Sequence, residues 1–176
     1  MLKKPGPARK VSTAAKRVRT RTSAGSPILT AADVRTILHD LATQLAPADV
    51  AALMSEEKTL RARADGLADP QLLLLRAQLR LALDCLRDHI DGACPQIPYY
   101  TIALLAAAVS YFSNELDVVP DFLPHVGQLD DAVVMAMACQ LGESGLKRYC
   151  TWKGVEIPSM AGVARRRPRP GTRRLA

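Results

Sequence analysis

Aromatic residues are scarce in this chain: they make up 4% of it, with one tryptophan, two phenylalanines and four tyrosines. Hydrophobic residues still reach 48%, so a core must be built mainly from Leu, Ala, Val and Met. These residue types favour helices over a β-sandwich, whose strands depend on aromatic and β-branched side chains. The 176 residues suffice for one domain of ordinary size with extensions.

Cysteine pairs and catalytic patterns are also missing. The four cysteines form no CxxC pair, and no Cys/His cluster has the spacing of a zinc site. No continuous apolar run follows the basic N-terminus, so no cleaved secretory signal is expected. We therefore expect free thiols in a reducing compartment, with Cys139 buried in its apolar stretch. No nucleophile elbow, phosphate-binding loop or His-Glu-x-x-His pattern occurs, so an enzyme is not the favoured class.

The net charge of +7 belongs to the two ends of the chain. Residues 25–160 carry ten Lys/Arg against all 17 Asp/Glu, a net charge of −7, so the body is acidic. Both ends are predicted to be disordered basic tails, at residues 1–27 and 159–176, because they have almost nothing to bury. The basic side chains of the tails are Lys3, Lys4, Arg9, Lys10, Lys16, Arg17, Arg19, Arg21, Arg165, Arg166, Arg167, Arg169, Arg173 and Arg174.

The tails have several interpretations. They suit an anionic membrane surface, where each basic residue contributes about 1 kcal/mol. They also suit nucleic-acid phosphates, bound without sequence preference, although no aromatic residue is present in them for base stacking. A transit segment at residues 1–24 and a merely solvated extension are the remaining possibilities.

Between the tails the apolar spacing predicts five helices, over about residues 30–45, 47–64, 70–92, 98–113 and 131–149. The third is the clearest, because Asp69 can cap it, Pro70 suits its first position and Gly92 ends it. Its core-facing side chains step by three or four residues: Leu72, Leu75, Leu79, Leu83, Leu86 and Ile90. The second has only a weak apolar stripe and is expected to be peripheral.

The fourth helix raises the question of a membrane span. Residues 99–112 are 14 nearly continuous apolar positions, which cover about 21 Å at 1.5 Å per residue. A span needs about 20 such residues. This helix and the fifth can be central helices of a soluble bundle or a hairpin that dips into one leaflet. Length alone favours a buried helix.

The connection between these two helices carries the most information. Two prolines push Val119 and Leu123 out of the helical region, so the chain is expected to be extended there. Gly127 permits a turn conformation that other residues resist. Asp130 is expected to cap the next helix, and Asp131 to complement its dipole.

This stretch resembles the signature of the YkvA-like family, a bacterial domain of unknown function (1232). The matching positions, in order and spacing, are Asp117, Pro120, Asp121, Phe122, Pro124, Gly127, Asp130 and Asp131. The chain departs from the family at Glu115-Leu116, where the family usually has a proline two residues before the aspartate. The resemblance covers about residues 95–150. It implies a helical fold and membrane association, and no common catalytic activity.

Four carboxylates of the connection also suit a hard cation, because oxygen ligands from one loop are typical of Mg²⁺ or Ca²⁺ sites. These are Asp117, Asp121, Asp130 and Asp131. Their spacing differs from an EF-hand loop. The alternative is structural: carboxylates that accept backbone N–H bonds in the turn and at the helix start. Asp130 and Asp131 make a poor catalytic pair, since adjacent helical residues point about 100° apart.

The sequence therefore predicts an all-α, compact bundle of about five helices at residues 28–158, centred on an apolar helical hairpin. The favoured function is a non-enzymatic module associated with an anionic membrane, in the cytoplasm or at the inner face of the membrane. The two alternatives are a nucleic-acid-associated protein that binds through its tails and a divalent-cation-binding domain. No organic cofactor is expected, and no particular protein partner is indicated.

Overall fold

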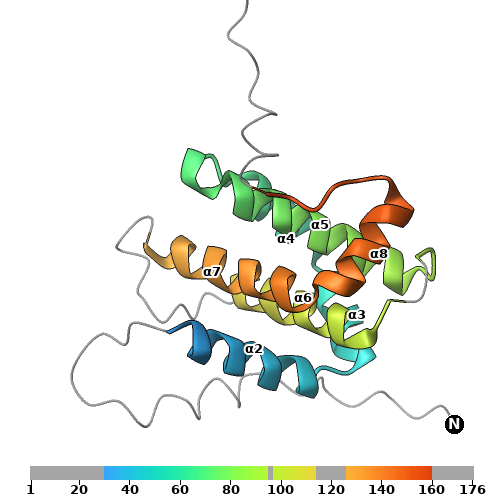
Figure 1. Ribbon diagram of the computed structural model, residues 1–176. Coiled ribbons are helices and arrows are strands. Elements are labelled where there is room, and N and C mark those ends of the chain that lie inside the picture. The colour runs from blue at the N-terminus through green and yellow to red at the C-terminus, as the bar shows by residue number, and fades with distance from the viewer. Residues whose placement is uncertain (1–29, 95–96, 114–125, 160–176) are drawn as a thin grey trace, which may run out of the picture. The chain divides into compact units, whose positions relative to one another are not determined.

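The computed structural model describes residues 30–94, 97–113 and 126–159. The chain divides into two compact units, residues 1–30 and 31–176, and the second is called the helical unit below. Its described residues form seven α-helices (Figure 1): α2 (Ala31–Gln44), α3 (Pro47–Met54), α4 (Glu57–Asp65), α5 (Leu73–Ile90), α6 (Tyr99–Ser113), α7 (Val126–Leu141) and α8 (Glu143–Lys153). A 3₁₀ turn, η1 (Pro70–Leu72), precedes α5. The predicted all-α class is confirmed.

Helix α6 is the core of the helical unit. It contacts α2, α3, α5, α7 and α8, so that protein covers it on all sides. Ten of its 15 residues are buried, in an unbroken run from Thr101 to Val109 and then at Phe112. Four alanines in that run let the neighbouring helices approach closely. The apolar stretch that raised the question of a membrane span is therefore a buried helix of this unit.

Helix α5 begins and packs as its sequence predicts. The Asp69 carboxylate accepts a hydrogen bond from the Gln71 backbone N–H at 2.8 Å, and Pro70 opens η1, which leads into α5. The expected leucine face is buried from Leu72 to Leu86. The prediction is wrong at the end of that face, because Ile90, in the last turn of α5, is 39% exposed.

The predicted second helix is two helices, α3 and α4, which meet at Ser55 and Glu56. The Ser55 hydroxyl donates to the Ala52 carbonyl at 2.6 Å, and this side-chain bond competes with continuation of the helix. Asp49 accepts a hydrogen bond from the Ala46 N–H at 2.8 Å and so caps α3. The break turns α4 so that its charged side chains meet α5.

The predicted fifth helix is also two helices, because Gly142 separates α7 from α8. The expected start at Asp131 is wrong: α7 begins at Val126, and no acidic residue lies in its first turn. Pro124 disfavours a helical backbone at the residue before it, so a helix can begin at Val126, and Gly127 is tolerated in the first turn. Asp130 and Asp131 therefore lie in the second turn of α7 and do not cap it.

Gly154 ends α8 in the left-handed region, with φ of 70°. The Val155 N–H then donates to the Cys150 carbonyl at 3.0 Å, which satisfies one of the last helical acceptors. A Cβ atom at this position would meet nothing within 4 Å, so its cost is conformational only. We expect Gly154→Ala to destabilise the protein by about 1 kcal/mol, and Gly154→Asn by less.

Urea unfolding of the two Gly154 variants and the wild type measures this cost. Gly66→Ala is the control, because Gly66 has φ of −68° and needs no left-handed conformation. Equal midpoints for Gly154→Ala and the wild type would contradict the prediction.

Candidate functional site

Most of the family-like connection lies outside the residues that the structure describes. This is the case for Asp117, Pro120, Asp121, Phe122 and Pro124. Gly127 is in the first turn of α7, and Asp130 and Asp131 follow in the second. The structure therefore describes the two helices that flank the connection.

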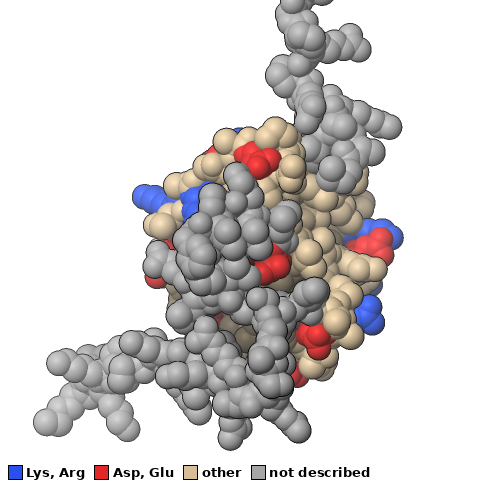
Figure 2. All heavy atoms as spheres, turned by 90° about the vertical axis from the view of Figure 1, so that its left-hand side faces the viewer, with Lys and Arg blue, Asp and Glu red and all other residues tan. Residues whose placement is uncertain are grey.

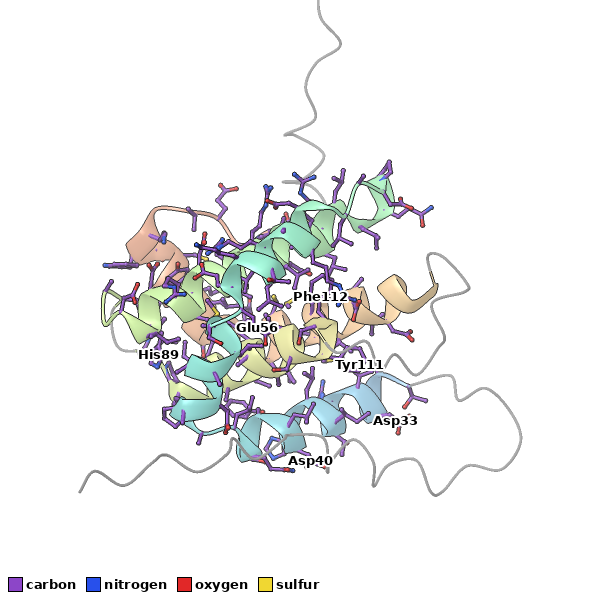
Figure 3. All side chains as sticks on the ribbon, turned by 180° about the vertical axis from the view of Figure 1, so that it is seen from behind. Asp33, Asp40, Glu56, His89, Tyr111 and Phe112 are labelled. Atoms are coloured by element: carbon purple, nitrogen blue, oxygen red, sulfur yellow. The ribbon has the colours of Figure 1, made fainter. Side chains whose placement is uncertain are left out.

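Helix α4 holds the end of α6 from which the connection leaves. The Arg63 guanidinium lies over the Phe112 ring, 4.9 Å from its centroid, and donates to the Ser113 carbonyl at 3.4 Å. Figure 3 labels Phe112 and its neighbour Tyr111 at this end of α6. This cation–π contact fixes where the connection begins. No local pattern predicts this contact, because 49 positions separate Arg63 from Phe112.

Asp130 and Asp131, the two carboxylates on the α7 side of the connection, differ in their surroundings. Asp131 is 4% exposed and is the one charged side chain among the buried residues that the structure describes. Asp130 is half-buried, and burial raises its pKa above the ordinary value of 3.8. The described residues contain no group of three metal-ligating side chains. Because Asp117 and Asp121 lie outside those residues, the Mg²⁺ or Ca²⁺ site stays a prediction.

An ionic network joins α4 to α5, and sequence reasoning missed it. The Glu57 carboxylate accepts hydrogen bonds from Arg61 at 2.7 Å and from Arg87 at 2.7 Å. Arg61 also donates to Asp84 at 2.7 Å. Burial raises the pKa of Glu57, but the two guanidinium groups outweigh it and hold the pKa below 4.5. Glu57 and Arg61 belong to α4, whereas their partners Arg87 and Asp84 belong to α5. The network therefore fastens the polar helix α4 to α5.

A second polar contact joins α5 to α8. The Tyr149 hydroxyl donates to Asp88 Oδ2 at 2.6 Å, and the Lys153 ammonium donates to the same oxygen. Tyr149 is fully buried, and burial together with the Asp88 carboxylate raises its pKa well above the usual range. The contact places the last turn of α8 beside the last turn of α5.

The four cysteines are free, and Cys139 is buried as predicted. Burial raises the pKa of Cys85 and of Cys139 to about 12. Such thiols are protonated at neutral pH and therefore poor nucleophiles and poor metal ligands.

Exposed apolar side chains gather at one end of the helical unit. Among the described residues, six large apolar side chains are exposed, and five of them belong to the last turn of α5, the first turn of α6, or the end of α8 and the residue after Gly154: Ile90, Tyr99, Tyr100, Trp152 and Val155. Figure 1 shows the last turns of α5 and α8 and the first turn of α6 together on its right-hand side. We call this surface the aromatic end. The sixth side chain, Val133, is on α7 and is 50% exposed.

Two histidines fix the tyrosines of the aromatic end. The His39 ring Nδ1 is 3.1 Å from the Tyr100 hydroxyl, and the His89 ring is 6.4 Å from the Tyr99 ring. The Tyr99 hydroxyl donates to the Leu45 carbonyl at 3.0 Å. Figure 3, seen from behind, labels His89 at this end. The rings are therefore held in place while about a third or more of each tyrosine meets solvent.

The opposite side of the helical unit has a different surface. Figure 2 looks onto that side and shows acidic and basic side chains scattered over its described part, without a wide field of one sign. All basic side chains of the two predicted tails lie outside the described residues. The candidate site that the structure describes is therefore the aromatic end.

Fold and surface together define a class: an all-α domain whose buried apolar helix leads, through an Asp- and Pro-rich connection, into a second helix packed against it. Residues 101–137, from α6 into α7, match the sequence profile of the family described as protein of unknown function (DUF1232). The chain is also 35% identical over 68 residues to the protein described as uncharacterized membrane protein YkvA of Bacillus subtilis (strain 168). The predicted resemblance to the YkvA-like DUF1232 family is therefore confirmed over this segment.

The match to the Bacillus subtilis relative covers only part of each protein. It covers 39% of this chain and 64% of the Bacillus subtilis relative. No solved structure matches the chain. Within the described residues, none of the helices combines the length and the apolar character that crossing a membrane requires.

Proposed function

We propose that this protein is a non-enzymatic helical module that associates with the surface of an anionic membrane. The observation that carries the proposal is the aromatic end, where five exposed apolar side chains gather on one side of an otherwise well-packed unit. Such a patch on a soluble domain is typical of an interaction surface, and Trp and Tyr are the residues enriched at membrane interfaces.

The family and the charge distribution support the same proposal. The Bacillus subtilis relative is described as a membrane protein, and it shares 68 aligned residues with this chain. Residues 1–24 and 161–176 carry eight and six basic side chains with no acid. Basic segments of this kind are attracted to the anionic lipid of the cytoplasmic leaflet, within about 10 Å of the surface at 0.1 M salt. The proposal therefore places the protein at the inner face of the membrane.

Flotation of the full-length protein with vesicles tests this function. We expect the protein to float with vesicles that contain phosphatidylglycerol, and to bind pure phosphatidylcholine vesicles more weakly. High salt should reduce binding to anionic vesicles without abolishing it, because the apolar part of the contact does not depend on charge. A protein that stays at the bottom of the gradient with every vesicle and at every salt concentration would refute the proposal.

A full-length variant separates the tails from the helical unit. In it all fourteen basic side chains of residues 1–24 and 161–176 are replaced by Gln. We expect this variant to lose most of the salt-sensitive binding and to keep the salt-resistant part. If the wild type instead binds duplex DNA and ignores vesicles, the nucleic-acid alternative replaces the membrane.

A further inference from the structure

Helix α8 divides cleanly into an inner and an outer face. Pairs of buried residues alternate with pairs of exposed residues along α8, which is the pattern expected when one face of a helix with 3.6 residues per turn is buried. The inner pairs pack on α6 and α7. Apart from Lys153, which is bound to Asp88, the exposed side chains form the α8 outer face: Glu143, Ser144, Lys147, Arg148, Thr151 and Trp152.

The α8 outer face is positively charged on an acidic body. The α8 outer face carries two basic side chains, Lys147 and Arg148, against one acid, Glu143, whereas residues 25–160 have a net charge of −7. Arg148 forms no ion pair with any residue that the structure describes. Lys147 pairs with Glu143 at 2.7 Å, but both side chains are more than half exposed, so the pair contributes little. Both cations can therefore meet an external anion.

Trp152 lies one helical turn after Arg148 on the same face, because residues four apart are neighbours along a helix. Its side chain is 46% exposed, and its ring is 5.8 Å from the buried Tyr149 ring, which limits its motion. A guanidinium beside an indole matches the headgroup region of a bilayer: the cation meets lipid phosphate, and the ring enters the boundary with the acyl chains.

We propose that the α8 outer face is the surface through which the helical unit contacts an anionic bilayer, with Arg148 and Lys147 on lipid phosphates and Trp152 inserted at the interface. This inference rests on the proposed membrane association and adds its orientation. The charge of the face and the amphipathic ring select an anionic lipid surface as its occupant. Ile90 and Val155, exposed at the same end, extend the apolar contact.

Trp152 supplies the direct test, because it is the one tryptophan of the chain. Full-length protein is mixed with phosphatidylglycerol/phosphatidylcholine vesicles that include brominated lipid. We expect its fluorescence to shift to shorter wavelength and to be quenched by the bromine. Flotation of the same sample reports binding independently. Protein that floats while its fluorescence neither shifts nor is quenched would overturn the α8 orientation and leave the proposed function standing.

Matched charge variants test the cations. Lys147→Gln with Arg148→Gln should weaken partitioning into anionic vesicles by about 25-fold, about fivefold for each charge lost near the surface. The control, Arg35→Gln with Lys58→Gln, removes the same charge from exposed positions on α2 and α4 and should change partitioning by less than about twofold. Equal losses in both variants would mean that only total charge matters, and would overturn the inference.

Trp152→Ala tests the apolar part of the contact. Measured in high salt, it should weaken partitioning by about tenfold, whereas Trp152→Phe should keep most of the binding. Val133→Ser, at the exposed apolar position on α7, is the control and should change little. If Val133→Ser weakens partitioning and Trp152→Ala does not, the contact with the bilayer is made by α7 instead. Failure of the wild-type protein to float would refute the membrane association itself.

Discussion

Gly145→Ala is expected to destabilise the helical unit by about 2–3 kcal/mol, because α8 crosses α6 too closely for a side chain at this position. An added Cβ atom would lie 2.4 Å from Thr101 Oγ1, 2.8 Å from its Cβ and 2.9 Å from its Cγ2. Thr101 is buried in the central helix, so it cannot swing aside into solvent. The helices must separate, and α6 loses part of its cover.

Urea unfolding measures this effect, with Gly66→Ala as the control. A Cβ atom at Gly66 would approach the carbonyls of Arg63 and Ala62, at 3.3 and 3.5 Å, and the backbone there is already right-handed. Thr101→Gly combined with Gly145→Ala should recover part of the loss, since the small residue is moved to the other helix. If Gly145→Ala stays within about 0.5 kcal/mol of the wild type, the close α6–α8 crossing is wrong.

Asp88→Ala is the second large effect, with an expected loss of about 2–3 kcal/mol at neutral pH. The substitution leaves the Tyr149 hydroxyl without its acceptor in a fully buried position and removes the anion beside Lys153. A buried donor that loses its acceptor costs about 1–3 kcal/mol, and a charged acceptor adds to that cost. Asp65→Ala is the matched control, because the Asp65–Arg80 pair is about half exposed and should contribute less than about 1 kcal/mol.

The same carboxylate makes stability depend on pH. Burial raises the pKa of Asp88, but the hydrogen bonds from Lys153 and Tyr149 outweigh it and hold the pKa below 3.8. A carboxyl whose pKa is lowered by folding stabilises the protein above its unfolded pKa of about 3.9, and this stabilisation is lost as the pH falls through the folded value. The pKa of Glu57 is also held below its ordinary value of 4.5, so the stabilisation from this carboxylate is likewise lost at low pH.

Urea midpoints measured between pH 7 and pH 3 test this dependence. We expect the wild type to lose stability from about pH 4.5 downwards, and Asp88→Ala to lose less over the same range. Tyr149→Phe should lower stability by about 1 kcal/mol and keep an acid loss, because Lys153 still holds Asp88 ionised. Parallel pH curves for the wild type and Asp88→Ala would contradict the assignment.

The sequence predicted the features that depend on local spacing. The leucine face of α5, the Asp69 cap and the long apolar helix α6 each follow from periodicity or from one side chain beside its own backbone. The break at Ser55 was missed because no glycine or proline marks it. The start of α7 at Val126 was missed because Asp130-Asp131 offered a plausible cap that the chain does not use.

The candidate site depends on contacts between distant residues, and no local pattern reveals those. Glu57 meets Arg87 across 30 positions, and Tyr149 meets Asp88 across 61. Ile90 continues the spacing of the leucine face, and only the packing of α5 against its neighbours decides that it is exposed. The aromatic end is likewise assembled from three helices, so its residues look unremarkable in their own segments.

The burial of α6 from Thr101 to Val109 has a consequence during synthesis. Its cover comes from both directions along the chain: α2 and α5 precede it, whereas α7 and α8 follow it. The ribosome finishes α6 at Ser113 and α8 at Lys153, about 40 residues and roughly 2–8 s later at 5–20 residues per second. Between the emergence of α6 from the ribosome and that of α8, the nascent chain presents the apolar side of α6 that α7 and α8 later cover. The growing polypeptide thus passes through a stage in which chaperones or lipid can bind a surface that the finished protein hides.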